Sequence, residues 1–131
     1  MYLSRRHALI VAAGFALAAA IPAFAFQATK FTPAALADAQ KTGKPVLVEV
    51  HAPWCPTCKA QAPILDKLLG SEKFKAFQIL AVDFDSQKTD LNALKVNMQS
   101  TLIVYKGDKE MGRSVGVTDA AAIEALLAKA L

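Results

Sequence analysis

The chain has 131 residues, of which 54% are hydrophobic and 20% are charged, and its formal net charge is +4 at pH 7. A chain of this length forms one domain that can bury a core of its own. The lysines are scattered, with no basic run and no ladder of aromatic residues, so nothing in the charge pattern indicates a nucleic-acid partner.

The N-terminal residues have the layout of a secretory signal. Arg5 and Arg6 precede an uncharged apolar stretch over residues 8–26, which ends near the small-residue pattern Ala23-Phe24-Ala25. This predicts a signal peptide over residues 1–25, cleaved after Ala25, and the arginine pair is similar to a twin-arginine export signal. The alternative is an uncleaved anchor, because residues 8–26 are just long enough to cross a bilayer. Either way, we expect residues 26–131 to form one domain in an extracytoplasmic, oxidising space such as the periplasm.

The rest of the chain predicts eight elements of secondary structure from its hydrophobic periodicity and turn residues. In order, these are a helix over 31–44, a strand over 45–50, a helix over 55–70, a strand over 77–84, a helix over 86–96, strands over 101–106 and 110–116, and a helix over 118–131. We expect Thr32 to cap the first helix, Gly70 to follow the second, Ser86 or Thr89 to cap the third and Thr118 to cap the last.

The order of these elements predicts an α/β fold. The first two strands are joined by a helix, which implies a parallel, right-handed crossover. The last two strands flank Gly107 and Asp108, which is a hairpin signal. The expected result is a mixed sheet of four to five strands between layers of helices.

Both cysteines lie in HAPWCPTCKAQAP, residues 51–63. As a structural staple, a disulfide between Cys55 and Cys58 closes so short a loop that it contributes only ~2 kcal/mol. At the start of a helix, however, Cys55 would face free N–H groups and the positive end of the helix dipole, which lower a thiol pKa from ~8.5 to about 3.5–7.5. Cys58, one turn further on, should be shielded and less acidic. This asymmetry fits one attacking and one resolving sulfur, so we favour a redox pair.

Three other residues near the cysteines stand out. Glu49 interrupts VLVEV, where a central strand should be apolar, and a buried carboxylate beside a nucleophile is a candidate functional group. The alternative is a strand-end glutamate that reaches water. Trp54 is expected to be partly exposed beside the pair. His51 is more often a packed or solvated residue than a metal ligand in such a position, so we expect no metal site.

The stretch VLVEVHAPWCPTCKAQAP resembles the thioredoxin family. A strand ends in Trp-Cys-x-x-Cys-Lys, a proline (Pro63) follows the first cysteine by eight residues, and STLIVYKGDKEMGRSVG continues the match through Gly116. The resemblance covers residues 30–131 and implies a thioredoxin-like three-layer fold. It also implies that Cys55 and Cys58 form a redox-active disulfide, in which Cys55 attacks and Cys58 resolves the mixed disulfide.

The resemblance assigns further roles. Glu49 matches the family's buried acid, which relays protons to and from the resolving cysteine. No dissociable cofactor is implied. The residues expected to line the groove for protein substrates are Trp54, Pro56, Thr57, Ser100, Thr101 and Gly116.

Two departures from the family pattern bear on this site. Ser100 stands where the family has a cis-proline next to the disulfide, and Ala81 stands where many members have a lysine near the buried acid. A cis bond before a residue other than proline costs ~3–4 kcal/mol, so we expect the Gln99–Ser100 bond to be trans. The Ser100 hydroxyl would then lie close to the sulfurs.

The expected function is that of an exported thiol:disulfide oxidoreductase. It would act as a monomer on protein thiols and disulfides, and a membrane protein would exchange electrons with it. Two alternatives remain open at this stage. One is a metal or iron–sulfur carrier on the same fold, and the other is a redox-inert, thioredoxin-like binding module.

Overall fold

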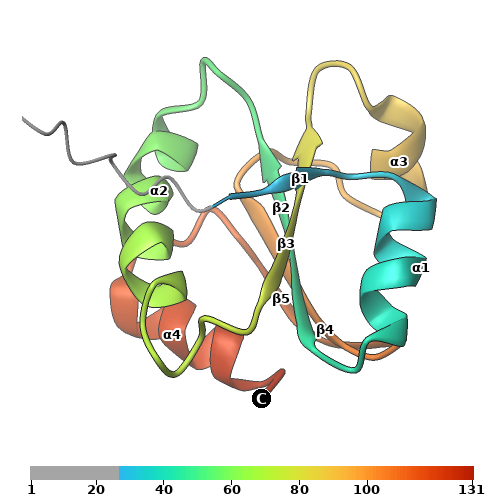
Figure 1. The fold of residues 1–131 in the computed structure, drawn as a ribbon. Helices are drawn as coiled ribbons and strands as arrows, with labels where there is room; N and C mark the ends of the chain where they lie inside the picture. Colours follow the sequence, from blue (N-terminus) through green and yellow to red (C-terminus); the bar gives the residue numbers. More distant parts are fainter. Residues whose placement is uncertain (1–26) are drawn as a thin grey trace, which may run out of the picture.

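Five strands form a mixed sheet between two layers of helices in the computed structural model, which describes residues 27–131 (Figure 1). The predicted signal over residues 1–25 lies outside the described residues. The elements in chain order are β1 (Thr29–Lys30), α1 (Pro33–Lys41), β2 (Pro45–His51), α2 (Pro56–Leu69), β3 (Gln78–Asp83), α3 (Lys88–Ala93), β4 (Thr101–Lys106), β5 (Lys109–Val115) and α4 (Ala120–Ala128).

The sheet has the strand order β1-β3-β2-β4-β5. The parallel pairing of β2 with β3 and the antiparallel hairpin of β4 and β5 confirm the predicted topology. Gly107 takes a φ of 58° in the hairpin turn, a backbone conformation that glycine adopts without strain. The additional strand β1 pairs in parallel with β3. At two residues it is too short to show an alternation pattern in the sequence.

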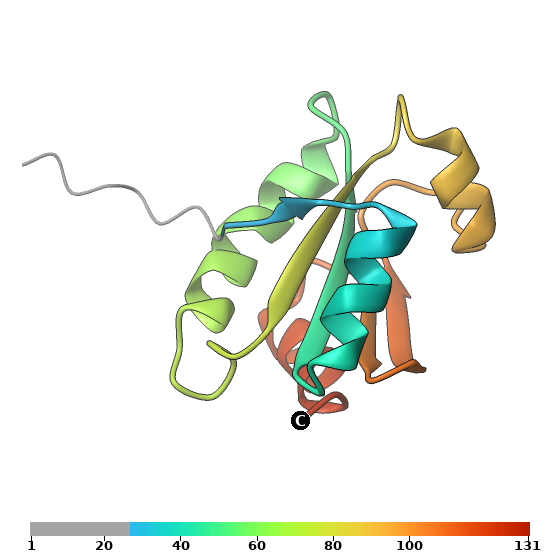
Figure 2. The same ribbon diagram turned by 45° about the vertical axis from the view of Figure 1, so that its right-hand side comes forward.

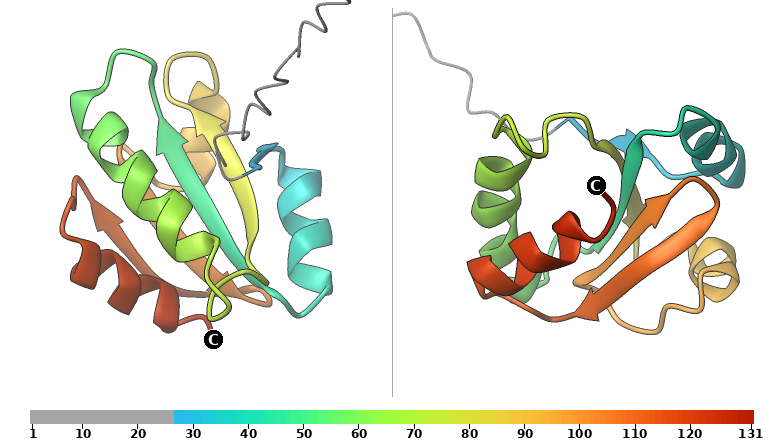
Figure 3. Two further views of the ribbon diagram at one scale, coloured as in Figure 1. Left: turned by 60° about the vertical axis from the view of Figure 1, so that its left-hand side comes forward. Right: turned by 90° about the horizontal axis from the view of Figure 1, so that it is seen from below.

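The alternation of side chains along β2 divides the core between the two faces of the sheet. Val46, Val48 and Val50 pack on the side of α1 and α3, in one apolar cluster with residues of those helices. Leu47 points to the other side and packs with residues of α2 and α4. Figure 2 shows α1 lying along its face of the sheet, and Figure 3 shows α2 and α4 side by side on the opposite face. Glu49 has the same parity as Leu47 and therefore belongs to the α2 face.

Thr32 caps α1 as predicted, with its hydroxyl accepting a hydrogen bond from the Ala35 N–H at 2.9 Å. The predicted cap of α4 is wrong by one residue. Asp119, rather than Thr118, precedes this helix, and its carboxylate accepts from the Ala122 N–H at 2.8 Å.

The predictions for the ends of α2 and α3 are also wrong. Neither Ser86 nor Thr89 caps α3, because the Ser86 hydroxyl is bound to the Asp83 carboxylate at 3.0 Å and the N-cap position belongs to Gln87. Gly70 is the C-cap of α2 with a φ of −78°, so it is not the left-handed residue that usually follows a helix.

No helix within residues 27–131 is both long enough and apolar enough to cross a membrane.

Candidate functional site

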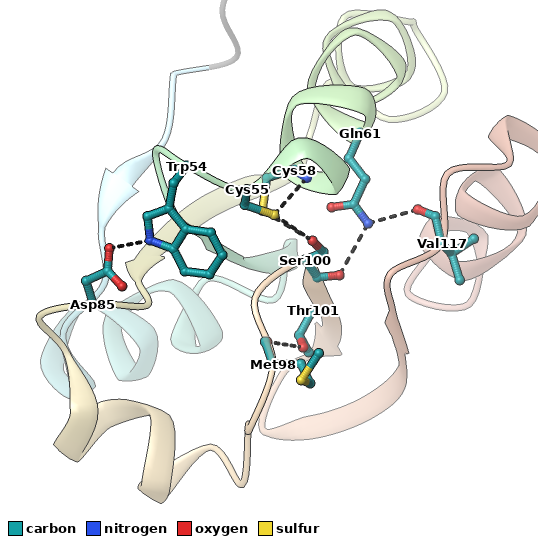
Figure 4. The surroundings of a disulfide bond; sticks show 9 residues. All are labelled: Trp54, Cys55, Cys58, Gln61, Asp85, Met98, Ser100, Thr101 and Val117. Atoms are coloured by element: carbon teal, nitrogen blue, oxygen red, sulfur yellow. Dashed lines mark hydrogen bonds between the residues drawn. A yellow bond between two sulfur atoms is a disulfide. The ribbon is translucent and has the colours of Figure 1, made fainter.

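The Cys55–Cys58 disulfide lies at the N-terminus of α2. Cys55 is the N-cap, and its Sγ accepts a hydrogen bond from the Cys58 N–H at 3.0 Å (Figure 4). Pro56 follows at the first helical position, where the absence of an N–H costs nothing. The first sulfur therefore lies where unpaired N–H groups and the helix dipole favour a negative charge, as the sequence predicts.

Cys58 is buried as expected, with an exposed fraction of 7%. The burial of Cys55 was not expected, and its exposed fraction is 0%. Both cysteines form a small cluster with Ala52, against which Phe84 packs. Cys55 is covered because the chain folds over it from other elements, which the local motif does not specify.

Ser100 lies directly against the disulfide. Its Oγ is 3.1 Å from the Cys55 Sγ and 3.2 Å from the Cys58 Sγ (Figure 4). No cis peptide bond occurs within residues 27–131, so the prediction of a trans Gln99–Ser100 bond is confirmed. Ser100 takes a φ of 63°, in the left-handed region that non-glycine residues rarely adopt. The N–H that a proline would lack donates to the Val50 carbonyl at 2.8 Å.

Gln61 joins three segments of the site and was missed by the sequence analysis. Its exposed fraction is 1%, and its Nε2 donates to the Ser100 carbonyl at 3.2 Å and to the Val117 carbonyl at 2.8 Å. Its Oε1 is buried and has no hydrogen-bond partner in the described part of the chain. A signal was available, since Gln61 is a polar residue on the same helical face as Cys58 and Leu65.

Glu49 is buried in β2, with an exposed fraction of 7%. In the sheet register it pairs with Ala81 on β3 and with Leu102 on β4. Burial raises the pKa of the Glu49 carboxyl above its usual value, while nearby His51 lowers it and Asp66 raises it further. A carboxyl in this environment holds its proton to a higher pH than an exposed glutamate.

Trp54 is exposed beside the pair, as predicted, with 54% of its surface accessible. Its Nε1 donates to the Asp85 carboxylate at 2.9 Å (Figure 4). Its ring also makes an edge contact with Phe84. Asp85 belongs to a turn organised by the Asp83 carboxylate, which accepts from the N–H of Asp85 and from the N–H and hydroxyl of Ser86. The Ser86 hydrogen bonds hold the pKa of the Asp83 carboxyl below its usual value.

The other predicted groove residues lie around the disulfide but differ in exposure. Pro56 is exposed, Thr57 is half-buried, and Thr101 is buried with its hydroxyl donating to the Met98 carbonyl at 2.7 Å. Gly116, at a φ of 68°, donates its N–H to the Ser100 carbonyl at 3.1 Å.

Two large apolar side chains near this groove were missed by the sequence analysis. Met98 and Val115 are each 52% exposed, and both line a small pocket that also includes Thr101. Exposure of large apolar side chains is read from the structure, because their spacing in the sequence does not reveal it.

His51 ends β2, half-buried, with an Nδ1 that lacks a hydrogen-bond partner within residues 27–131. In the same part of the chain, no three or more histidine, cysteine and acidic side chains come together as a group that could hold a metal ion.

Comparison with known proteins identifies the family. The model of the thioredoxin family matches residues 25–129. Thioredoxin of Chlamydia trachomatis is 36% identical over 84 residues, which is 64% of this chain and 80% of that protein. Thioredoxin-2 of Saccharomyces cerevisiae is 35% identical over 83 residues, which is 63% of this chain and 78% of that protein.

The comparison with solved structures gives a similar result. The crystal structure of Trxlp from Edwardsiella tarda superposes with a TM-score of 0.72 at 40% sequence identity, and the match covers 75% of this chain and 95% of that one. The predicted three-layer fold and the predicted family are therefore both confirmed.

Proposed function

Because this chain belongs to the thioredoxin family, we propose that it exchanges disulfides with protein substrates outside the cytoplasm, through Cys55 as the attacking and Cys58 as the resolving sulfur. Its class is that of a thioredoxin-type thiol-disulfide oxidoreductase with a CxxC pair. One observation carries the assignment of the two roles. Cys55 is the N-cap of α2 and its sulfur accepts the Cys58 N–H, so Cys55 is the sulfur that the helix N-terminus stabilises as a thiolate.

The proposed reaction has two steps. The Cys55 thiolate attacks one sulfur of a substrate disulfide, a new bond forms to that sulfur, and the other substrate sulfur leaves as a thiolate. Cys58 then loses its proton and attacks the Cys55 sulfur. The internal disulfide closes and the second substrate thiolate leaves, so two electrons have passed from the protein to the substrate. The reverse sequence oxidises a substrate dithiol.

Glu49 is the proposed proton acceptor for Cys58. It lies on the strand that leads into the motif and on the face of the sheet covered by α2. Its raised pKa matches the task, because a base that gives up and takes back a proton near neutral pH must titrate closer to that range than an exposed glutamate does.

The partner groove is proposed to run beside the disulfide, with Trp54, Met98 and Val115 as its exposed apolar contacts. Apolar and aromatic side chains of this kind are the usual anchors of protein interfaces. In an oxidising space, the cysteine pair would exchange electrons with a membrane protein.

The reduction potential of the Cys55–Cys58 couple tests the redox part of the proposal. The protein is equilibrated in glutathione buffers and the oxidised fraction is measured. A reversible two-electron couple is expected, and a value near about −270 mV would identify a reductant, whereas one near about −120 mV would identify a disulfide donor. The absence of any reversible couple would overturn the proposal.

Export is tested on the full chain expressed in a Gram-negative host. We expect to find the protein in the periplasmic fraction, with the mass of a chain that starts at Phe26. If the twin-arginine route is used, the double variant Arg5→Lys, Arg6→Lys should remain unprocessed. Processing of that variant at the wild-type level would exclude the twin-arginine route. An uncleaved chain in the membrane fraction would replace the signal peptide with an anchor.

A further inference from the structure

The environment of Cys55 raises a problem for a thiolate. The side chain is completely buried, and its cluster partners Ala52 and Phe84 are apolar. Burial in apolar surroundings opposes the formation of a thiolate, since no water solvates the charge. The charge then depends on hydrogen-bond donors that the protein itself supplies.

Two donors contact the Cys55 sulfur within the described part of the chain. One is the Cys58 N–H at 3.0 Å, and the other is the Ser100 hydroxyl at 3.1 Å (Figure 4). The same hydroxyl oxygen is 3.2 Å from the Cys58 sulfur, so it remains within reach of both when the disulfide opens. A hydroxyl carries one proton to donate and can also accept.

Three hydrogen bonds to the Ser100 backbone fix the position of this hydroxyl. The Ser100 N–H donates to the Val50 carbonyl at 2.8 Å, and the Ser100 carbonyl accepts from the Gly116 N–H at 3.1 Å and from the Gln61 Nε2 at 3.2 Å. These hydrogen bonds hold the residue at a φ of 63°, a strained conformation that persists where the surroundings over-determine it. The side chain is thereby directed at the sulfurs.

We propose that the Ser100 hydroxyl donates a hydrogen bond to the Cys55 thiolate in the reduced protein, while the Cys58 thiol donates one to the Ser100 oxygen. These two hydrogen bonds make the disulfide easier to reduce. A hydrogen bond to a charged acceptor is about twice as strong as one to a neutral acceptor, and exclusion of water strengthens it further. The hydroxyl thus stabilises the thiolate more than it stabilises the disulfide. This inference concerns the same cysteine pair as the proposed function and rests on it.

The affected equilibrium with glutathione balances as follows. The Cys55–Cys58 disulfide and two glutathione thiols give the Cys55 thiolate, the Cys58 thiol, one released proton and one glutathione disulfide. Two electrons pass from glutathione to the protein. Ser100 gains and loses no atom, and acts only through its hydrogen bond to the Cys55 sulfur.

The test compares wild-type protein with Ser100→Ala and Ser100→Gly, all made from the full chain. In the reduced proteins, the ultraviolet absorbance of the thiolate is followed against pH. Loss of the hydroxyl is expected to raise the pKa of Cys55 by about one unit, a tenfold change in its ionisation constant. The glutathione equilibrium should move about tenfold toward the disulfide, which corresponds to about 30 mV more negative.

Two comparisons separate the hydrogen bond from a general disturbance. Ser100→Gly removes the hydroxyl and relieves the left-handed strain, so both variants should shift alike. Thr101→Val removes the neighbouring buried hydroxyl, which donates to the Met98 carbonyl and not to sulfur, and should leave the Cys55 titration unchanged. The difference in reduction potential between wild type and Ser100→Ala should also become smaller at pH values below the pKa of Cys55, where no thiolate is present.

The inference is overturned if folded Ser100→Ala and Ser100→Gly titrate like wild type, if only Ser100→Ala shifts, or if Thr101→Val shifts as much. The thiolate titration needs no substrate. A Ser100 effect on the titration, in a protein without reversible exchange, would therefore refute the proposed function and the effect on reduction, and would leave standing only the hydrogen bond from Ser100 to the Cys55 thiolate.

Discussion

The two halves of α2 bury side chains of different kinds on one helical face. In the first half, the buried side chains are Cys58 and Gln61, and both contact Ser100 through hydrogen bonds. In the second half, they are Leu65 and Leu69, which pack in the apolar cluster shared with α4. The periodicity is the same throughout. One face therefore positions a reactive pair at its N-terminal end and anchors the helix at its C-terminal end.

The largest expected effect comes from the first half and concerns the two sulfurs themselves. Cys55→Ser should abolish disulfide exchange, because the sulfur that the helix N-terminus activates for attack is gone. Cys58→Ser should still attack but should not resolve, so it should accumulate a covalent complex with substrate. Insulin reduction and non-reducing electrophoresis measure the two outcomes. Accumulation of a complex with Cys55→Ser and not with Cys58→Ser would reverse the assigned roles.

The next effect comes from the second half. Leu65 is completely buried, so Leu65→Ala should lower the free energy of unfolding by about 2–5 kcal/mol through lost burial and a cavity. Denaturant unfolding measures this change. The glutathione equilibrium of the folded variant should match that of wild type, and a changed equilibrium would show that the two halves are coupled. Leu36→Ala is the control, because Leu36 on α1 is only partly buried and its truncation should lower the free energy of unfolding by less.

Gln61 lies at the boundary between the halves and should show both kinds of effect. Gln61→Leu removes two hydrogen bonds and leaves the Ser100 and Val117 carbonyls with fewer donors, which should cost about 1–3 kcal/mol of stability. It should also loosen Ser100 and raise the pKa of Cys55. Gln61→Glu, which keeps the shape but loses the donor, is the matched variant. A change in stability without any change in the Cys55 titration would show that the role of Gln61 is purely structural.

The smallest effect concerns Glu49 and depends on pH. Burial raises the pKa of this carboxyl in the folded state, so the folded protein binds more protons than the unfolded one between the two pKa values. Its contribution to stability is fully present below the unfolded pKa and is lost as pH rises through the folded pKa. The loss is at most about 1.4 kcal/mol per pH unit for one proton.

The stability of Glu49→Gln should therefore lack the decline that Glu49 causes in the wild type over this pH range. Unfolding in denaturant at a series of pH values measures the difference. Parallel curves for the two proteins would contradict the raised pKa. If Glu49 also serves Cys58 as base, the variant should resolve mixed disulfides more slowly without a change in the rate at which they form.

Much of this molecule could be predicted because its signals are local. Residues 45–50 are an apolar run broken by one acid, Gly107 and Asp108 mark the hairpin, and Thr32 caps α1 as expected. The predicted cap of α4 was wrong by one residue, since the neighbouring Thr118 and Asp119 can both cap the same N–H groups and only the folded backbone selects between them. The prediction for Gly70 was wrong because the exact end of a helix is poorly marked in the sequence.

The parts that could not be predicted depend on contacts between distant segments. Cys55 is completely buried in a cluster to which Phe84 and Ser100 come from distant parts of the chain. The bond from Trp54 to Asp85 spans 31 residues of sequence, and Met98 and Val115 are exposed only because no element covers them.

The sequence by itself determined the order of the helices and of every strand except β1, the placement of Cys55 at a helix start and the presence of an acid in the central strand, because each follows from periodicity or from a short motif. Only the tertiary structure decided what touches the sulfurs. Ser100 is 45 residues from Cys55 along the chain, and its hydroxyl reaches the pair because Val50, Gly116 and Gln61 hold its backbone in a left-handed conformation. Hydrogen bonds between segments so far apart are set by packing, and no local pattern encodes them.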